Sequence, residues 1–509
     1  MNTRNAYALR SRQAGKVAPF GLGTAPRPLA LADADMPPHP ACATLPNRVC
    51  RHALADRNEN ARLNAREQAV KGRFDAIVPA LKAISALQHG ADFVERAQAL
   101  ARQQLGYALP EEILENAWSN GLDVKALYAR CVFAALLASA EEFSAEYGRR
   151  NGSWQDLHSF FLDCGFHAID ISPCADGRLK GLLPYILRLP ATPFIRRKAY
   201  AGAMFDVETD VRQWMAVELG RFREGVPNLA EAETRYLKIA VYHLSSSSPD
   251  HEGCAAHGSD DSRAIEAALQ RLLEFRQAIE NSFCCGAGTD ILLIGVDTDT
   301  DAIRVHVPDE NGNLSASRYV DNAALYAASL GFGENEARLA VHQAILDAGA
   351  SKPHEGMRRL IANLLINNLS QIEYVAEYYG GRYQDIGHAE RYISVGDGFE
   401  EVQMRNVAYY AHLHTLEEGM ADMDIGIKIF RQLMVRRGLP VPIAIHFRYD
   451  ARVPGSRTRA VSRTKRVEEA IRSRYLDLDA AGLLACHLTV QDLPAGSLIE
   501  EIIDENHAS

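Results

Sequence analysis

A short polar turn between a strand and a helix constrains this chain more than any other stretch. Residues 166–171 have the apolar character of a strand, and residues 179–189 form an apolar run that predicts a helix. Between them, Cys174, Asp176 and Arg178 occupy alternate positions of the turn. Ligands of open α/β sheets bind at the carboxyl ends of the strands. The pattern therefore predicts a sheet that presents a thiol, a carboxylate and a guanidinium to one small volume.

The central region, residues 150–390, continues the alternation of strands and helices. The apolar pattern predicts, in order, a helix at 205–222, a strand at 236–242, a helix at 262–283, a strand at 290–296 and two or three helices within 320–380. Such a βαβ order predicts a mostly parallel sheet. The fold class is therefore α/β in the centre and α+β over the whole chain.

Length, charge and cysteine content exclude several classes of protein. A chain of 509 residues indicates two or three domains. The net charge of −10 argues against a body that binds nucleic acid, and no apolar run approaches the ~20 residues of a membrane helix. An apolar signal core is also missing at the start of the sequence. Nine scattered cysteines indicate a reduced cytosolic chain, in which clustered thiols hold a metal or do redox chemistry.

Residues 1–45 are predicted to be an arm without regular structure, because they contain many prolines and little apolar surface. Five basic residues precede the first acid, Asp33: Arg4, Arg10, Arg12, Lys16 and Arg27. One interpretation is a solvated tail. The other is a basic peptide that docks on an acidic partner, with Tyr7, Leu9 and Phe20 as its anchors.

Residues 46–149 are predicted to form a helical domain, with Cys131 as a core residue. Residues 391–509 weakly echo the central region, since the strand at 442–446 resembles the strand at 239–243 and also ends in histidine. We expect no thiolate near residue 396 or after residue 446, so this region would be a metal-free repeat. Chance similarity between short strands is the alternative interpretation.

Three side chains near strand ends form a candidate metal site: Cys174, His243 and Cys254. Three protein ligands and one open position are typical of a catalytic zinc. Two histidines are candidates for the ligand that lies between Cys174 and Cys254 in the sequence. His243 ends a strand, which fixes its position, whereas His251 completes a His-x-x-Cys pattern within a polar loop. Asp176 would accept the hydrogen of the hydroxide that attacks the substrate, and Arg178 would hold Asp176; a surface ion pair is the simpler alternative for these two.

The Cys-x-Asp-x-Arg turn resembles the zinc motif of β-type carbonic anhydrases. The longer stretches 163–181 and 293–306 resemble the carboxysomal carbonic anhydrases, a divergent relative once called the ε class. The resemblance runs from about residue 40 to the C-terminus. It implies a β-carbonic-anhydrase-like zinc domain at 150–390, followed by a metal-free repeat at 391–509. It also favours His243 over His251, because these enzymes carry an insertion between the histidine and the second cysteine.

This resemblance further implies one Zn²⁺ per chain, CO₂ and bicarbonate as substrates, and a place in the carboxysome of the bacterial cytoplasm. The expected partners are the carboxysome shell, RuBisCO through the N-terminal arm, and a second copy in a homodimer or larger assembly. Neither nucleic acid nor a membrane is expected. The principal alternative is a carboxysome scaffold protein with a structural zinc and no turnover. A thiol oxidoreductase is a second alternative, but the sequence has no Cys-x-x-Cys.

Two further candidates follow from the sequence. His388, at the junction with the repeat, could shuttle protons or line the pocket, although a buried and satisfied histidine explains it equally well. The vicinal pair Cys284–Cys285 is more often plain packing than a redox device.

Overall fold

The computed structural model describes residues 7–8, 51–147, 153–189, 195–226, 234–283, 287–349, 352–397, 403–411, 416–494 and 497–502. The chain divides into two compact units. The first, here called the central unit, contains residues 29–64 and 151–387. The second, here called the terminal unit, contains residues 1–28, 65–150 and 388–509. Each unit is built on a six-stranded sheet.

The sheet of the central unit has the strand order β3-β2-β4-β5-β6-β7. Its strands are β2 (Ala168–Pro173), β3 (Ile195–Arg197), β4 (Thr234–Leu244), β5 (Ala287–Asp297), β6 (Ile303–His306) and β7 (Tyr319–Asp321). The pairs among β3, β2, β4 and β5 are parallel, whereas β6 and β7 join in antiparallel fashion. The carboxyl ends of β2 and β4 therefore meet at the same edge, as the βαβ pattern predicts.

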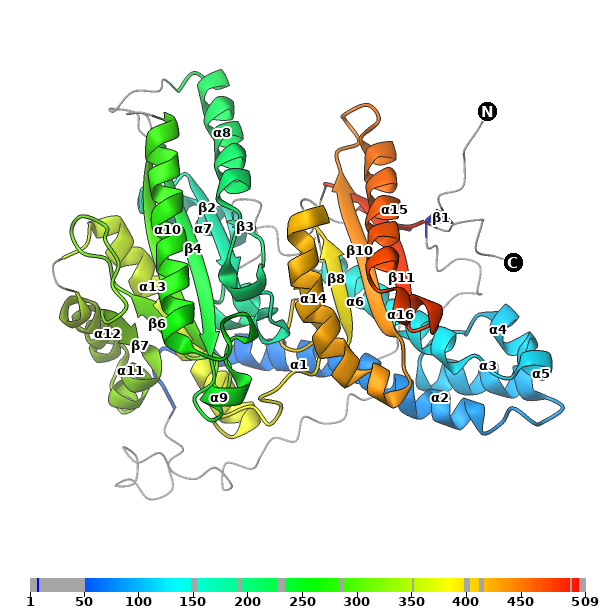
Figure 1. The fold of residues 1–509 in the computed structure, drawn as a ribbon. Coiled ribbons are helices and arrows are strands. Elements are labelled where there is room, and N and C mark those ends of the chain that lie inside the picture. The colour runs from blue at the N-terminus through cyan, green and yellow to red at the C-terminus, as the bar shows by residue number, and fades with distance from the viewer. Residues whose placement is uncertain are drawn as a thin grey trace. The chain divides into compact units, whose positions relative to one another are not determined.

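Long helices cover this sheet. Helix α10 (Asp261–Phe283) packs on β4 and β5, with α8 (Val207–Arg223) beside it (Figure 1). Helices α11 (Asn322–Ser329), α12 (Glu334–Ala348) and α13 (Glu355–Tyr379) pack together next to β6 and β7. The remaining helices of the unit are α7 (Ser153–Asp163) and the single turn α9 (Pro249–Glu252). Trp214 of α8 stacks on Tyr236 of β4 with ring centroids 4.5 Å apart, so an aromatic contact anchors the helix layer to the sheet.

The terminal unit repeats the topology of the central one. Its sheet has the order β9-β8-β10-β11-β12-β1. The strands are β8 (Tyr392–Gly396), β9 (Ala408–Ala411), β10 (Val441–Tyr449), β11 (Leu484–Asp492), β12 (Ile499–Glu501) and β1 (Tyr7–Ala8). Again the first four strands in this order pair in parallel and the last two in antiparallel fashion. The two sheets thus share the direction of pairing at every position, but they differ in their last strand: β7 follows β6 in the chain, whereas β1 comes from the start of the sequence.

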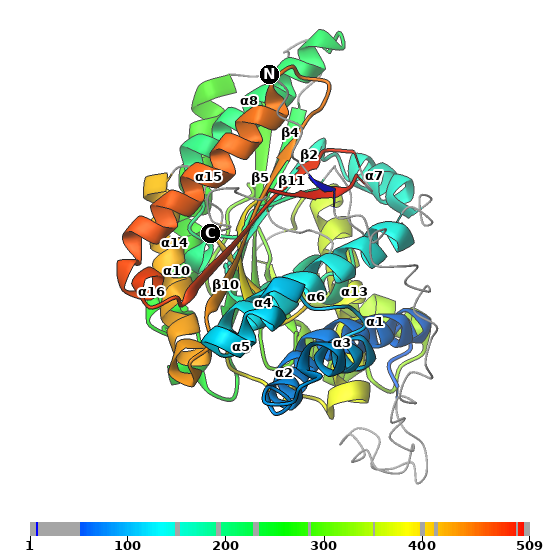
Figure 2. The same cartoon turned by 90° about the vertical axis from the view of Figure 1, so that its right-hand side faces the viewer.

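Helices cover both faces of the terminal sheet. Helices α14 (Leu416–Leu433) and α15 (Ser456–Arg474) take the places that α8 and α10 take in the central unit, and α16 (Leu476–Ala480) follows. Helix α6 (Val124–Tyr147) packs on β10 and β11 from the opposite face (Figure 2). Cys131 of α6 is buried, which confirms its prediction as a core residue.

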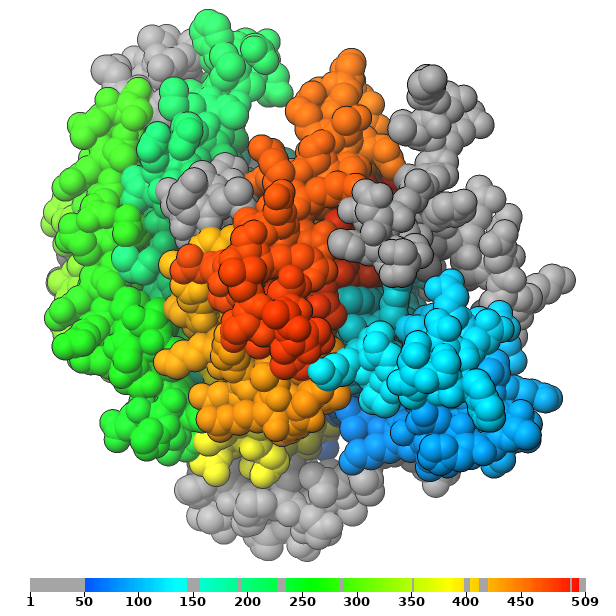
Figure 3. Space-filling model, turned by 45° about the vertical axis from the view of Figure 1, so that its right-hand side comes forward, coloured from blue at the N-terminus to red at the C-terminus, as the bar shows by residue number. Residues whose placement is uncertain are grey.

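The other helices before the central sheet are α1 (Arg57–Asp75), α2 (Ile77–Ser85), α3 (Phe93–Gln104), α4 (Glu111–Glu115) and α5 (Ala117–Asn120). Figure 3 shows the blue-to-cyan surface of these N-terminal helices beside the orange-to-red surface of the C-terminal segment. Lys125 Nζ of α6 lies 3.2 Å from the carbonyl oxygen of Ala481, directly after α16. Residues 65–150 therefore belong to the same compact unit as the C-terminal sheet.

Most of the long predicted elements of the central unit are confirmed, but the helix predicted for 179–189 is wrong. Residues Gly177–Leu179 form a 3₁₀ turn and residues Leu182–Ile186 a single π-turn. Pro184 lies inside the apolar run, and it has no N–H group to donate to an α-helical ladder. Of the predicted arm, the structure describes Tyr7 and Ala8, whose backbone pairs with Glu501 and Glu500 of β12. None of the helices that the structure describes has the length and apolar character needed to span a membrane.

Candidate metal centre

The three predicted metal ligands converge at the carboxyl edge of the central sheet. The Cys174 N–H, directly after β2, donates to the carbonyl oxygen of Val241 at 3.0 Å, so the thiol is held beside β4. His243 is a buried residue of β4, and Cys254 follows α9. The ligand atoms of Cys174, His243 and Cys254 all lie within 4.8 Å of one another, and the two sulfur atoms are 3.9 Å apart.

The two thiols differ in acidity because they are close to each other. The hydrogen bond from Cys174 lowers the pKa of Cys254, despite its burial, and backbone N–H groups of Ala256 and His257 add to the effect. The same contact and burial raise the pKa of Cys174 well above its usual value. A second thiolate beside the first is therefore costly unless a cation shares the site.

His243 supplies the test of whether a metal fits. Its Nδ1 is buried and has no hydrogen-bond partner within the described part of the protein. A buried ring nitrogen without a hydrogen-bond partner destabilises the fold. Coordination of a cation by this imidazole would offset that cost. Two thiolates and one imidazole form a donor set that suits Zn²⁺. The residues present therefore fit the metal that the sequence predicts.

Asp176 and Arg178 form a buried bidentate ion pair beside these ligands. Arg178 donates from Nε to Asp176 Oδ1 at 2.9 Å and from Nη2 to Oδ2 at 2.8 Å. Its backbone N–H also donates to Oδ1 at 2.9 Å, so Asp176 caps the 3₁₀ turn. The exposed fractions of the two side chains are 5% for Asp176 and 0% for Arg178, which rules out the surface ion pair. Asp176 Oδ2 lies 3.3 Å from His243 Nε2, next to the ligand set.

The guanidinium of Arg178 also ties two loops to the site. Its Nη1 donates to the carbonyl oxygens of Glu252 and Ile386, each at 2.8 Å. Glu252 precedes Cys254 by two residues, so this contact helps to place the second thiol. A guanidinium can make these contacts together because its five N–H donors form a rigid fork.

Asp299 holds the loop between His243 and Cys254. Ser245 Oγ donates to both carboxylate oxygens at 3.0 Å, and the backbone N–H of Ser247 donates to Oδ2 at 2.8 Å. Ser247 Oγ donates to the same oxygen at 2.5 Å. Sequence reasoning missed Asp299, although three acids at alternate positions from 297 to 301, after the strand at 290–296, could have pointed to a loop-binding carboxylate.

Gly202 is a second residue that sequence reasoning missed. Its N–H donates to Cys174 Sγ at 3.3 Å, and an N–H donor stabilises a thiolate. The glycine has φ = 65°, and a Cβ there would lie 2.6 Å from His257 Nε2. The site therefore requires glycine both for its backbone conformation and for the space beside His257.

The other candidates named from the sequence are two histidines and a cysteine pair. His251 is an exposed residue of α9, and it is outside the groups of possible metal ligands among the residues described. His388 belongs to the terminal unit, where its Nδ1 lies 2.8 Å from Glu390 Oε1. Cys284–Cys285 lies outside the described residues.

Comparison with known proteins identifies the family. Residues 52–144, 156–388 and 389–506 match the N-terminal, catalytic and C-terminal domains of the family described as Carboxysome Shell Carbonic Anhydrase. The carboxysome shell carbonic anhydrase of Halothiobacillus neapolitanus is 55% identical over 99% of both chains. The protein of the same name from Prochlorococcus marinus strain MIT 9313 is 49% identical over 90% of this chain and 91% of its own. That from Parasynechococcus marenigrum is 50% identical over 88% and 78%.

The parallel sheet, the Cys-His-Cys centre and the matched catalytic domain define an α/β enzyme of the carbonic anhydrase class. The chain belongs to the carboxysome shell carbonic anhydrase family.

Proposed function

We propose that this enzyme uses one zinc ion per chain, held by Cys174, His243 and Cys254, to interconvert CO₂ and bicarbonate. The observation that carries the proposal is the convergence of these three buried ligands beside a carboxylate that an arginine holds from two sides. Zinc bound there would supply a Lewis acid that lets water act as a nucleophile near neutral pH.

Asp176 orients the nucleophile in this proposal. Its Oδ2 faces the ligand set and accepts a hydrogen bond from the attacking oxygen, which directs a lone pair toward the carbon of CO₂. Arg178 holds the carboxylate and prevents it from turning toward the metal, because both carboxylate oxygens are already engaged. Addition of water to CO₂ gives bicarbonate and one proton, and the reverse reaction uses the same groups.

A structural zinc in a scaffold protein is the alternative. Structural zinc sites are closed by four protein ligands, whereas catalytic sites keep one position open. In the part of the central unit that the structure describes, the convergent ligand set has three members. A three-membered set favours the enzyme over the scaffold.

The decisive experiment combines metal content with turnover. The purified protein should contain one zinc per chain and lose CO₂ hydration activity when a chelator removes the metal. Cys174→Ser should lose zinc and activity together, since a hydroxyl is a poor zinc ligand at neutral pH. His251→Ala is the matched control and should keep both. Full zinc content in Cys174→Ser, or zinc loss in His251→Ala, would refute this ligand set.

His388 remains our proposed proton shuttle. Its side chain is 21% exposed and contacts the buried carboxylate of Glu390, so the ring has both solvent access and a partner for the imidazolium. His388→Ala should slow turnover in dilute buffer, and added imidazole should restore it. Equal rates of the variant and the unmodified enzyme at every buffer concentration would remove His388 from the mechanism.

We further propose that the enzyme supplies CO₂ to RuBisCO inside the carboxysome and that the basic arm, residues 1–45, docks it there as a homodimer or larger assembly. The five basic residues before Asp33 and the family membership support this proposal. Deletion of residues 1–40 should leave CO₂ hydration intact and abolish binding to RuBisCO in a pull-down, and salt should weaken binding of the full chain. Binding that survives the deletion would assign docking to another segment.

A further inference from the structure

The terminal unit has a pocket at the place that corresponds to the metal centre. The first residue after β2, Cys174, donates its N–H to Val241, and the first residue after β8, Asp397, donates its N–H to His446 at 2.8 Å. These matched bonds place Asp397 at the position of Cys174 and Arg448, two residues beyond His446, at the position of His243. The sequence comparison had matched His446 with His243, so the correspondence shifts by two residues.

None of the groups of possible metal ligands among the described residues lies wholly within the terminal unit. The expectation that no thiolate follows residue 446 overlooked Cys486, a residue of β11. Burial raises the pKa of its thiol to about 12, and Cys486 is outside the groups of possible metal ligands among the described residues. The carboxyl edge of this sheet therefore has a different chemistry from that of the central sheet.

A cavity of about 340 Å³ opens at this edge, between the end of β10 and the start of α15. Its lining residues are Phe447, Arg448, Tyr449, Asp450, Val453, Ser456, Arg459, Ala460 and Arg463. The four residues from α15 are spaced as one face of a helix, so Arg459 and Arg463 project from adjacent turns. Arg448 joins them from the strand.

Three arginines line this cavity, and two carboxylates offset part of their charge: Asp450 in the lining and Asp397, whose Oδ2 accepts the backbone N–H of Arg448 at 2.7 Å. The carboxylate of Asp450 already accepts from Arg452, a residue outside the lining, at 2.9 Å from both Nε and Nη2. Arg463 lies over the ring of Phe447 at 4.2 Å, which fixes the plane of its guanidinium, and burial lowers its pKa despite the nearby Asp397. The first turn of α15 contains no acidic residue, so the positive end of the helix dipole adds to the three guanidinium groups.

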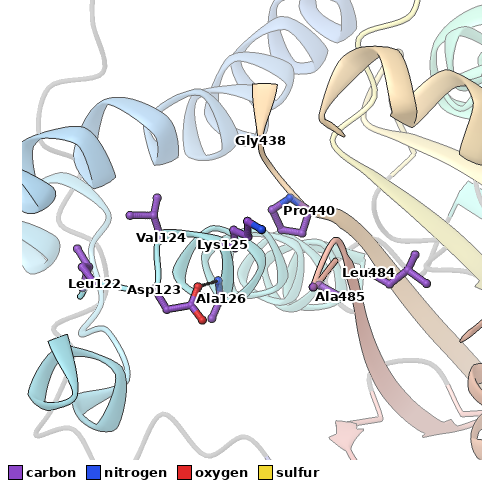
Figure 4. A pocket seen from close by; sticks show the side chains of 10 residues that line it. Leu122, Asp123, Val124, Lys125, Ala126, Gly438, Pro440, Leu484 and Ala485 are labelled. Carbon is purple, nitrogen blue, oxygen red and sulfur yellow. Dashed lines mark hydrogen bonds between the residues drawn. The ribbon is translucent and has the colours of Figure 1, made fainter. Parts of the chain in front are cut away.

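A second cavity in the terminal unit shows the contrast. It measures about 770 Å³ and lies at the opposite ends of β10 and β11, and Figure 4 shows Lys125 and Asp123 among mostly small and apolar neighbours. The one basic side chain in the lining of this second cavity, Lys125, is thus accompanied by the acidic side chain of Asp123. The cluster of arginines is therefore found in the cavity at the carboxyl edge and not in this second cavity.

We propose that the arginine-lined cavity at the carboxyl edge of the terminal sheet binds a phosphate-class dianion, either inorganic phosphate or the phosphate group of a monoester. Planar guanidinium groups bind phosphate oxygens in pairs, and three arginines less the one carboxylate of Asp397 leave a positive charge that a dianion balances better than a monoanion. The end of a strand followed by a helix N-terminus is also the usual place for a phosphate in α/β folds.

The test is equilibrium dialysis of the full-length, zinc-loaded protein with labelled inorganic phosphate, in a buffer free of phosphate and sulfate. We expect one site per chain with submillimolar affinity. Arg459→Gln and Arg463→Gln should each weaken binding at least tenfold, which corresponds to about 1.4 kcal/mol. Because Arg459 is exposed, its variant tests the proposal even if Arg463→Gln fails to fold.

Two controls distinguish binding in this cavity from binding to the surface of α15 or to the metal centre. Arg466→Gln removes the same charge from the exposed surface of α15, outside the lining, and should leave binding unchanged. Cys174→Ser should also leave it unchanged, since it alters only the metal centre. A repeat with glycerol 3-phosphate identifies the source, since tighter binding of the ester indicates an organic phosphate. Undetectable binding at millimolar phosphate, or equal binding by Arg459→Gln and the unmodified protein, would refute the proposal.

Discussion

Replacing Asp299 with alanine should weaken metal binding without touching a metal ligand. The carboxylate accepts hydrogen bonds from Ser245 Oγ, the Ser247 N–H and Ser247 Oγ, all within the loop that joins His243 to Cys254. Hydrogen bonds to a charged group contribute roughly 1.5–3 kcal/mol each, and partial rehydration of the freed donors recovers part of this. A net loss of roughly 3 kcal/mol in loop stability follows.

Only part of this lost loop stability lowers the affinity for the metal, because the Arg178 contact to Glu252 still restrains the loop next to Cys254. Groups that hold metal ligands in place typically change metal affinity by about 10- to 100-fold. We therefore expect a zinc dissociation constant that is about 10- to 100-fold higher in Asp299→Ala, measured by competition with a chromophoric chelator.

The matched control is Asp309→Ala in the same unit. Asp309 also holds a loop, through the N–H groups of Asn311 and Asn313 at 2.9 Å, but this loop carries none of the proposed ligands. It should bind zinc as the unmodified protein does. Unchanged zinc affinity in Asp299→Ala, or an equal loss in Asp309→Ala, would show that the serine loop does not position Cys254.

Two other predictions concern the catalytic carboxylate and the dependence of stability on pH. Asp176→Asn should retain zinc but lose about 10²–10³ in kcat, because an amide can donate to the nucleophile and misorient it. A rate near that of the unmodified enzyme would show that Asp176 only caps the turn. Asp290 is partly buried, which would raise its pKa, but the hydrogen bond from His354 and the charge of Arg235 lower the pKa below its usual value. The ionised carboxylate thus stabilises the fold above the unfolded-state pKa, and this contribution is lost as pH falls through the folded-state pKa. Asp290→Asn should lower the Tm at pH 7 by an amount equivalent to roughly 1–3 kcal/mol, and the difference should shrink below pH ~4. A gap in Tm that is independent of pH would contradict this assignment.

The convergence of the candidate ligands could be predicted from the sequence because much of the polar chemistry lies in one turn. Cys174 and Asp176 directly follow an apolar strand, and strand ends are fixed by the sheet. Spacing alone selects His251, which completes a His-x-x-Cys pattern with Cys254, whereas His243 is favoured by its place at the end of a strand. The structure brings His243 to the site because β4 continues to Leu244, whereas the loop that follows leaves His251 exposed.

Other features depend on contacts that no local pattern encodes. The short strands β3, β6, β7, β9 and β12 have three or four residues each, and such segments are strands only because a neighbour pairs with them. The π-turn at Leu182–Ile186 follows from Pro184, which the apolar pattern alone ignores. The role of Asp299 arises from side-chain contacts across about 50 residues of sequence. In each case the deciding interaction is tertiary.

The two sheets show how one scaffold can acquire opposite preferences for charge. At the carboxyl edge of the central sheet, two thiols and an imidazole converge, and the nearby cation Arg178 is neutralised by Asp176. At the corresponding edge of the terminal sheet, Arg448 occupies the place of His243, and α15 contributes two more guanidinium groups. A permanent positive charge at a ligand position repels a divalent cation, and at 4 Å a pair of unit charges already interacts by about 4 kcal/mol at an effective dielectric of 20. In the two proposals above, the arginines make this edge selective for anions, so the terminal sheet and the central sheet bind ions of opposite sign.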